Sequence, residues 1–216
     1  QPQLHLWEQW FSVAAFPYLG DHRVQGEVVF PGAGYVEMVF AAGNSVFGES
    51  AFQIEHLAFE HMLALADDEV RLVQLSLLEE AGERATLTIS SRRENVKEWV
   101  RHVSGSLRAV KGSNADPALM VRDAVEARCP TVIESRKHYD EAEARGISLG
   151  ATFRGVTSIR IGEDEVVTRV RIPEELRKDM GGYLIHPAML DAYFHAALRT
   201  NLPTLGKGTV VPTSIG

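Results

Sequence analysis

The sequence predicts an α+β fold built from two halves, each of which combines one long helix with an antiparallel sheet. Two segments, 33–42 and 186–200, carry apolar residues at helical spacing. Two others, 52–110 and 151–173, alternate in part with the period of a strand. A turn-rich stretch, "KGSNADP" at 111–117, separates the first pair of segments from the second. We therefore expect two units in which a sheet wraps around a helix.

The first half has a strand-like run after His22 and continues into a helix. Pro31 and Gly32 mark the helix start, apolar residues between 33 and 42 share one face, and Gly43 supplies a stop. Polar turns then divide the residues that follow into strands. These strands are predicted over residues 52–63, 69–79, 84–92 and 98–110.

The second half reverses this order, with its strands before its helix. Residues 151–173 predict two strands around the turn "GEDE", and Pro187 occupies an early position of the helix that follows. No strands are predicted after that helix, so we expect the second sheet to be incomplete at the C-terminus and the chain to be a piece of a longer polypeptide. The predicted division is an N-terminal unit over 1–112 that carries His22, a linker over 113–135, and a C-terminal unit over 136–216 that carries Asp191.

Composition restricts the classes of function. The 216 residues suit one large domain or two small ones, and 45% hydrophobic residues suffice for a sizeable core. The formal net charge of −7 and the absence of a Lys/Arg block argue against nucleic acid as a partner. No apolar run reaches the ~18 residues of a membrane span, and the first residues do not resemble a signal peptide. The single cysteine, Cys129, excludes an intrachain disulfide, so we expect a reducing, cytoplasmic setting.

The first candidate constellation is His22-x3-Gly26-x4-Pro31. The imidazole of His22 can accept a proton near neutral pH because its ordinary pKa is about 6.5. Gly26 allows backbone or ligand to approach closely. Pro31 and Gly32 open a helix whose first N–H groups can stabilise a developing oxyanion. A base and an oxyanion site joined by one short strand fit the abstraction of a proton beside a carbonyl.

The second constellation is Asp191 and His195, which lie four residues apart and so share one helix face. Their neighbours are apolar, and desolvation is expected to raise the pKa of Asp191 and keep the carboxyl protonated. Two other interpretations stay open: an acid favoured by the helix dipole beside an ordinary histidine, and a metal-hydrolase site made of His186, Asp191 and His195. The remaining histidines are interpreted as structural: His5, His56, His61, His102 and His138.

Two stretches, "LGDHRVQGEVVFPGAGYVEM" and "HPAMLDAYFHAAL", resemble the dehydratase domains of modular type I polyketide synthases. The first is similar to that family's HxxxGxxxxP motif at His22, Gly26 and Pro31, and the second to its HPxxxDxxxQ/H motif from His186 to His195. The resemblance implies a double hotdog fold and dehydration of a β-hydroxyacyl thioester. In it His22 takes the α-proton and Asp191 protonates the departing hydroxyl.

The same resemblance implies the supporting groups and partners. His195 would hydrogen-bond Asp191, and Gly32, Gly26 and Pro31 would support the site. An acyl carrier protein delivers the substrate, neighbouring polyketide synthase domains and a second copy in a homodimer are expected, and no metal or organic cofactor is implied.

One stretch departs from the family pattern. "GISLGATF" puts Leu149 where the family often has Tyr and Ala151 where it has Pro. Two alternatives therefore stay open: an enoyl isomerase and a heterocycle-forming cyclase of the same fold. A non-catalytic thioester-binding module is a separate alternative that does not depend on this stretch.

Overall fold

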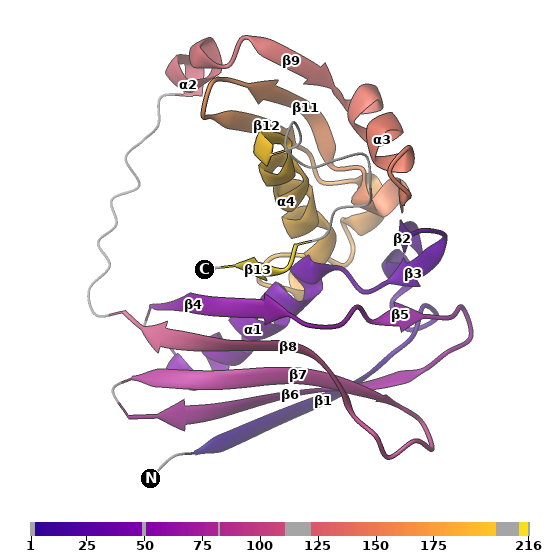
Figure 1. Cartoon of the computed structure of the whole chain (residues 1–216), viewed down its shortest axis with the longest axis vertical. Coiled ribbons are helices and arrows are strands. Elements are labelled where there is room, and N and C mark those ends of the chain that lie inside the picture. Colours follow the sequence, from indigo (N-terminus) through magenta and orange to yellow (C-terminus); the bar gives the residue numbers. More distant parts are fainter. Residues whose placement is uncertain (1–2, 49–50, 82, 111–121, 202–211, 216) are drawn as a thin grey trace.

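The computed structural model describes residues 3–48, 51–81, 83–110, 122–201 and 212–215 (Figure 1). Its largest sheet is antiparallel, with the order β1-β6-β7-β8-β4-β13. The predicted strands between residues 52 and 110 all belong to it, whereas its edge strand β1 was not predicted. The bounds are β1 Leu4–Phe11, β4 Phe52–Phe59, β6 Arg71–Glu80, β7 Arg84–Arg93, β8 Val100–Ala109 and β13 Ser214–Ile215.

Helix α1 (Gly32–Phe47) packs against this sheet and buries Tyr35, Val36 and Val39. The predicted stop at Gly43 is wrong, because the helix continues for another turn. Gly48 ends it instead, with a positive φ of 60° that suits glycine. Gly43 has a packing role: a Cβ at this position would lie 2.5 Å from the ring of Phe52, where β4 begins.

The second half has its own sheet, in the order β12-β11-β9. The pair β11 (Val156–Ile161) and β12 (Val166–Val170) was predicted, and helix α4 (Pro187–Asn201) packs on both. Strand β9 (Thr131–Glu134) pairs with β11, so the last residues of the expected linker belong to this sheet. The remaining helices of this half are α2 Arg122–Arg128, α3 Ser135–Glu143, and the 3-10 turns η2 Ala151–Phe153, η3 Glu174–Leu176 and η4 Met180–Gly182.

A third sheet, β10-β2-β3-β5, joins the two halves. Strands β2 (His22–Val24) and β3 (Glu27–Val29) form a hairpin whose turn residues, Gln25 and Gly26, both have positive φ values of 53° and 88°. That conformation is the type I′ turn, which favours glycine. The other two strands are β10 Ile147–Leu149, which comes from the second half, and β5 Ala64–Leu65; the 3-10 turn η1 Pro17–Asp21 leads into β2.

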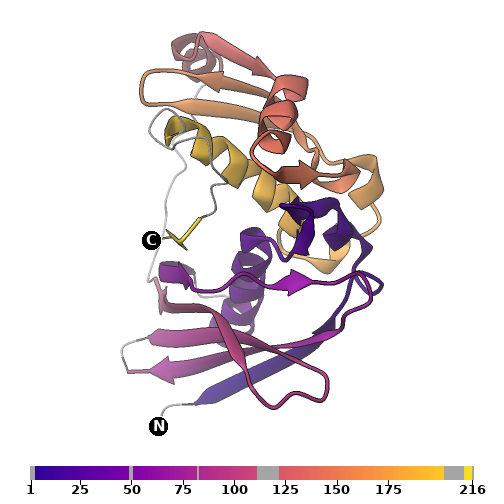
Figure 2. The same cartoon turned by 45° about the vertical axis from the view of Figure 1, so that its right-hand side comes forward.

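Helices α1 and α4 pack against each other at the centre, and each is flanked by its own sheet (Figures 1 and 2). The large sheet lies on the outer side of α1, and the three-stranded sheet lies on the outer side of α4. This is the pair of helix-and-sheet units expected from the sequence. No helix among the described residues is long and apolar enough to cross a membrane.

Candidate active site

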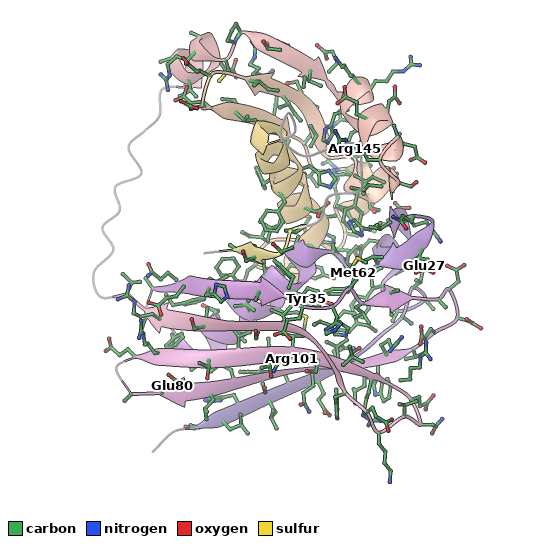
Figure 3. All side chains as sticks on the ribbon, viewed as in Figure 1. Glu27, Tyr35, Met62, Glu80, Arg101 and Arg145 are labelled. Atoms are coloured by element: carbon green, nitrogen blue, oxygen red, sulfur yellow. The ribbon has the colours of Figure 1, made fainter. Side chains whose placement is uncertain are left out.

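A cavity of about 270 Å³ lies between the two halves and is lined from both. Two residues of its wall, Tyr35 and Met62, are labelled where the halves meet (Figure 3). The wall is mostly apolar, which suits an acyl chain, and a few polar groups interrupt it. Its lining includes His22, Val29, Gly32, Tyr35, Met62, Ile147, Asp191, Phe194 and His195.

His22 is the first residue of β2 and is 8% exposed. Its Nδ1 lies 2.7 Å from the backbone oxygen of Val29, on the neighbouring strand β3. A carbonyl oxygen only accepts, so Nδ1 carries the hydrogen of this bond and Nε2 keeps its lone pair. The ring of Phe153 packs against the imidazole, with centroids 5.1 Å apart. The hairpin thus fixes both the tautomer and the orientation of His22.

Asp191 lies in the second turn of α4 and is 6% exposed. One helical turn further along, His195 places its Nε2 3.1 Å from Oδ2 of Asp191. The predicted sharing of one helix face is therefore correct, and the two side chains form an ion pair when the imidazole is protonated.

The predicted direction of the Asp191 pKa shift is wrong. Burial does raise the pKa, as expected, but neighbouring imidazoles outweigh it. His195 contributes most to this opposite effect, followed by His22 and His138, and the pKa of Asp191 lies below its ordinary value. The imidazoles around Asp191 therefore favour the ionised form of its carboxyl.

The three supporting residues of the first motif have different places. Gly32 is the first residue of α1 and lines the cavity. Pro31 is the N-cap of the helix, and its carbonyl accepts the N–H of Gly34 at 2.8 Å. Gly26 lies in the exposed hairpin turn and does not line the cavity, and no atom lies within 4 Å of a Cβ built on it. Glycine is favoured at position 26 because the turn needs a positive φ, and not because backbone or ligand approaches it closely, as the sequence predicts.

His186 does not join Asp191 and His195 in a metal site. It is fully buried, and its Nδ1 accepts the backbone N–H of Ala188 at 3.2 Å, so it caps the start of α4. Within the described part of the chain, no three His, Cys, Asp or Glu side chains gather closely enough to hold a metal ion. The metal-hydrolase interpretation therefore lacks its ligand set.

Two histidines whose sequence context predicts a structural role lie at the site. His138 of α3 is buried, and its ring centroid is 5.6 Å from that of His195. His61 lines the cavity beside Met62. No spacing in the sequence signals either position, because both reach the site through tertiary packing.

The altered "GISLGATF" stretch lies directly against His22. Leu149 is the register partner of His22 in the β10–β2 pair. Next to it, the carboxylate of Asp21 accepts the backbone N–H of Thr152 at 2.9 Å and its hydroxyl at 2.8 Å. The departure from the family pattern therefore concerns the immediate surroundings of His22.

Two family models together match most of the chain. Residues 1–92 match "Polyketide synthase dehydratase domain", and residues 117–216 match "Polyketide synthase dehydratase N-terminal domain".

Curated relatives are much longer proteins. The chain is 29% identical over 219 residues to a phthioceranic/hydroxyphthioceranic acid synthase of Mycobacterium tuberculosis, with 100% of this chain and 10% of the relative covered. It is 32% identical over 213 residues to the polyketide synthase GfsB of Streptomyces halstedii, with 94% of this chain and 4% of that protein covered. The chain thus spans about a tenth or less of the curated relatives that it matches.

Solved structures share the architecture of this chain over nearly all of its length. The dehydratase domain of a mycocerosic acid synthase-like polyketide synthase is 30% identical, with a TM-score of 0.87 over 98% of this chain and 73% of that one. The dehydratase domain from the CurJ module of the curacin polyketide synthase is 28% identical, with a TM-score of 0.86 over 100% and 76%. The fold is a double hotdog, and domains of this family are hydro-lyases that act on β-hydroxyacyl thioesters. From the fold, the cavity and these relatives together, we conclude that the chain belongs to the polyketide synthase dehydratase family.

Proposed function

We propose that this chain dehydrates a β-hydroxyacyl thioester to the α,β-enoyl thioester during polyketide assembly, with His22 as base and Asp191 as acid. The observation that carries the proposal is that these two buried side chains, from opposite halves of the fold, line one apolar cavity. The reaction needs a base at the α-carbon and an acid at the hydroxyl oxygen of the adjacent β-carbon. A cavity with one titratable group from each half meets that requirement.

His22 abstracts the α-proton through Nε2, because Nδ1–H is engaged by the carbonyl of Val29. The C–H electron pair becomes the α,β-double bond, and the bond from the β-carbon to oxygen breaks. The first N–H groups of α1, beginning at Gly32, stabilise the charge that develops on the thioester oxygen. A related observation supports a histidine: a solved CurJ dehydratase, 28% identical, is an inactive mutant with a histidine replaced by phenylalanine.

Asp191 protonates the departing hydroxyl, which leaves as water. Because the pKa of Asp191 is lowered, we infer that the proton comes from His195 across the 3.1 Å ion pair as the hydroxyl begins to leave. The pair then acts as one acid with one proton, and its two members titrate together. After the reaction, the proton on His22 balances the proton lost by the pair, so solvent exchange restores the starting state.

The substrate and partners belong to the same proposal. We infer an acyl chain carried on the phosphopantetheine arm of an acyl carrier protein, and neighbouring polyketide synthase domains that supply and accept it. Tethering gives such a substrate a high effective concentration, so the net charge of −7 does not prevent delivery from an acidic carrier. We also infer a homodimer and a cytoplasmic location, consistent with a single cysteine.

The test is turnover of a β-hydroxyacyl carrier-protein thioester, followed as loss of one water by mass spectrometry. We expect His22→Phe and Asp191→Asn each to lose at least about 10²-fold in kcat, the usual contribution of a general acid or base. The exposed residues His56 and Asp164 provide matched controls, as His56→Phe and Asp164→Asn. Parent-like rates in either folded site variant contradict the assigned roles.

A second candidate rests on the surroundings of His22. Leu149 is the register partner of His22 at a position where the family often has a tyrosine, so the tyrosine hydroxyl is missing from the surroundings of the proposed base. An enoyl isomerase or a cyclase of the same fold could use the same base with a different outcome. Analysis of the product by mass spectrometry and NMR separates them: an α,β-enoyl product supports the dehydratase, and a shifted double bond or an oxygen heterocycle supports the alternative.

A further inference from the structure

Glu37 is a buried carboxylate outside the cavity wall. Only 6% of it is exposed, and no Lys, Arg or His in the described ranges forms an ion pair with it. Its Oε1 accepts the backbone N–H of Leu184 at 2.8 Å, and its Oε2 accepts that of Ile185 at 3.0 Å. Burial raises the pKa of Glu37, and these two hydrogen bonds oppose the rise. A carboxylate is the side chain that offers two acceptors in this fork.

The two N–H groups belong to the chain that leads into α4. Ile185 is followed by His186, which is fully buried and caps the helix through Ala188. The His186 ring is held edge-on by Tyr18 and Tyr183, with centroids 4.8 Å and 4.6 Å away. The start of α4 is therefore fixed by contacts on several sides, and Glu37 hydrogen-bonds the backbone just before it.

Asp191 comes soon after this fixed point. It is in the second turn of α4, and an α-helix is stiff over so short a length, so the helix start determines where the carboxyl lies. At the other end, Glu37 sits in α1, whose first residue Gly32 lines the cavity. That helix follows directly on β3, and the Val29 carbonyl of β3 orients His22.

We propose that Glu37 is a positioning residue of the active site: it ties α1, on the side of the base, to the start of α4, on the side of the acid. The inference rests on the proposed function. The link joins residues 147 and 148 positions apart in the sequence, and it sets the separation of His22 and Asp191. A displacement of about 1 Å in a catalytic group can cost about 10²-fold in rate.

Two substitutions separate positioning from folding. Glu37→Gln keeps the shape but leaves one carbonyl oxygen for two N–H groups. Glu37→Met removes the buried charge and both acceptors while keeping a flexible side chain of similar length, and circular dichroism and urea unfolding show whether the variant remains folded. We expect kcat to fall about 10- to 100-fold in both, with KM changed less than about twofold. The exposed Glu163→Gln is the matched control.

A double-mutant cycle with Asp191→Asn distinguishes positioning of Asp191 from a merely structural role. It compares how much Glu37→Gln lowers kcat in the parent and in the Asp191→Asn protein. If Glu37 acts through Asp191, Glu37→Gln slows the Asp191→Asn protein by less than about twofold. Equal slowing in both backgrounds, or parent-like kcat in the folded Glu37 variants, overturns the proposal.

Amide hydrogen exchange tests the link without turnover. Glu37→Gln should speed exchange at Leu184 and Ile185 relative to the parent, and unchanged exchange at both amides overturns the proposal. A parent protein that does not dehydrate its substrate refutes the proposed function, and with it the catalytic purpose of Glu37. In that case faster exchange still establishes the link between α1 and α4.

Discussion

Gly150, in the second half of the fold, contacts Asp21, the residue before His22, and donates its backbone N–H to the Asp21 carbonyl at 2.8 Å. A Cβ placed there would overlap Oδ1 and Cγ of Asp21 and would lie 2.8 Å from its Cβ. The backbone of Gly150 has φ −78° and ψ −174°, which alanine adopts without strain. Gly150→Ala therefore tests one contact: the Asp21 side chain must move away, and its two hydrogen bonds with Thr152 must break.

The cost follows from those two bonds. A hydrogen bond to a charged group contributes about 1.5–3 kcal/mol, and both groups here are half-buried, so the lower figure applies to each. The 2.8 Å contact with the Asp21 Cβ adds about 1 kcal/mol to the 3 kcal/mol of the two bonds, so we expect Gly150→Ala to lower the free energy of unfolding by about 4 kcal/mol. For a chain of this size, that corresponds to a fall in Tm of about 8–16 °C.

A double-mutant cycle with Asp21→Ala provides the assay, using urea unfolding followed by circular dichroism. Asp21→Ala alone should cost about 3 kcal/mol, since it removes the same two bonds without adding a Cβ. In that background Gly150→Ala should cost only about 1 kcal/mol, because the Cβ contact is all that remains. The double variant then loses about 4 kcal/mol. A loss equal to the sum of the single variants, about 7 kcal/mol, refutes the reasoning.

Two further predictions concern histidines. His195→Gln removes the imidazole that lowers the pKa of Asp191 most, so that pKa should rise; a carboxyl 13C NMR titration checks this, and an unchanged or lower value contradicts it. Burial lowers the pKa of His102 and of His186, so the unfolded chain binds more protons than the folded one below about pH 6.5. The free energy of unfolding should therefore fall as pH drops from 7.5 to 5.5, by up to about 1.4 kcal/mol per pH unit for each group. Urea unfolding of the parent and of His102→Gln measures this pH dependence of the free energy of unfolding. The variant should show the smaller pH dependence. An equal pH dependence in both proteins excludes His102 as a contributor.

The elements with long, regular patterns could be predicted from sequence. Strands β6, β7 and β8 and helix α4 have the predicted type and nearly the predicted bounds, because local periodicity reports which side faces a core. Short strands were missed: β9, β10 and β13 have four residues or fewer and depend on distant partners for their hydrogen bonds. The helix end predicted at Gly43 was wrong for a similar reason. Glycine is needed there because the ring of Phe52 leaves no room for a Cβ, and not because the helix ends.

The sequence by itself determined which side chains could do chemistry, because residue type sets what can accept a proton and the motif spacing places His22 before a helix start and Asp191 one turn from His195. Only the tertiary structure decided which groups contact those side chains. It brought both to one cavity, surrounded Asp191 with three imidazoles, and packed Glu37 of α1 against the backbone just before α4. The physical reason is that charge interactions and hydrogen bonds depend on distance through space, and the chain separates these groups by many residues.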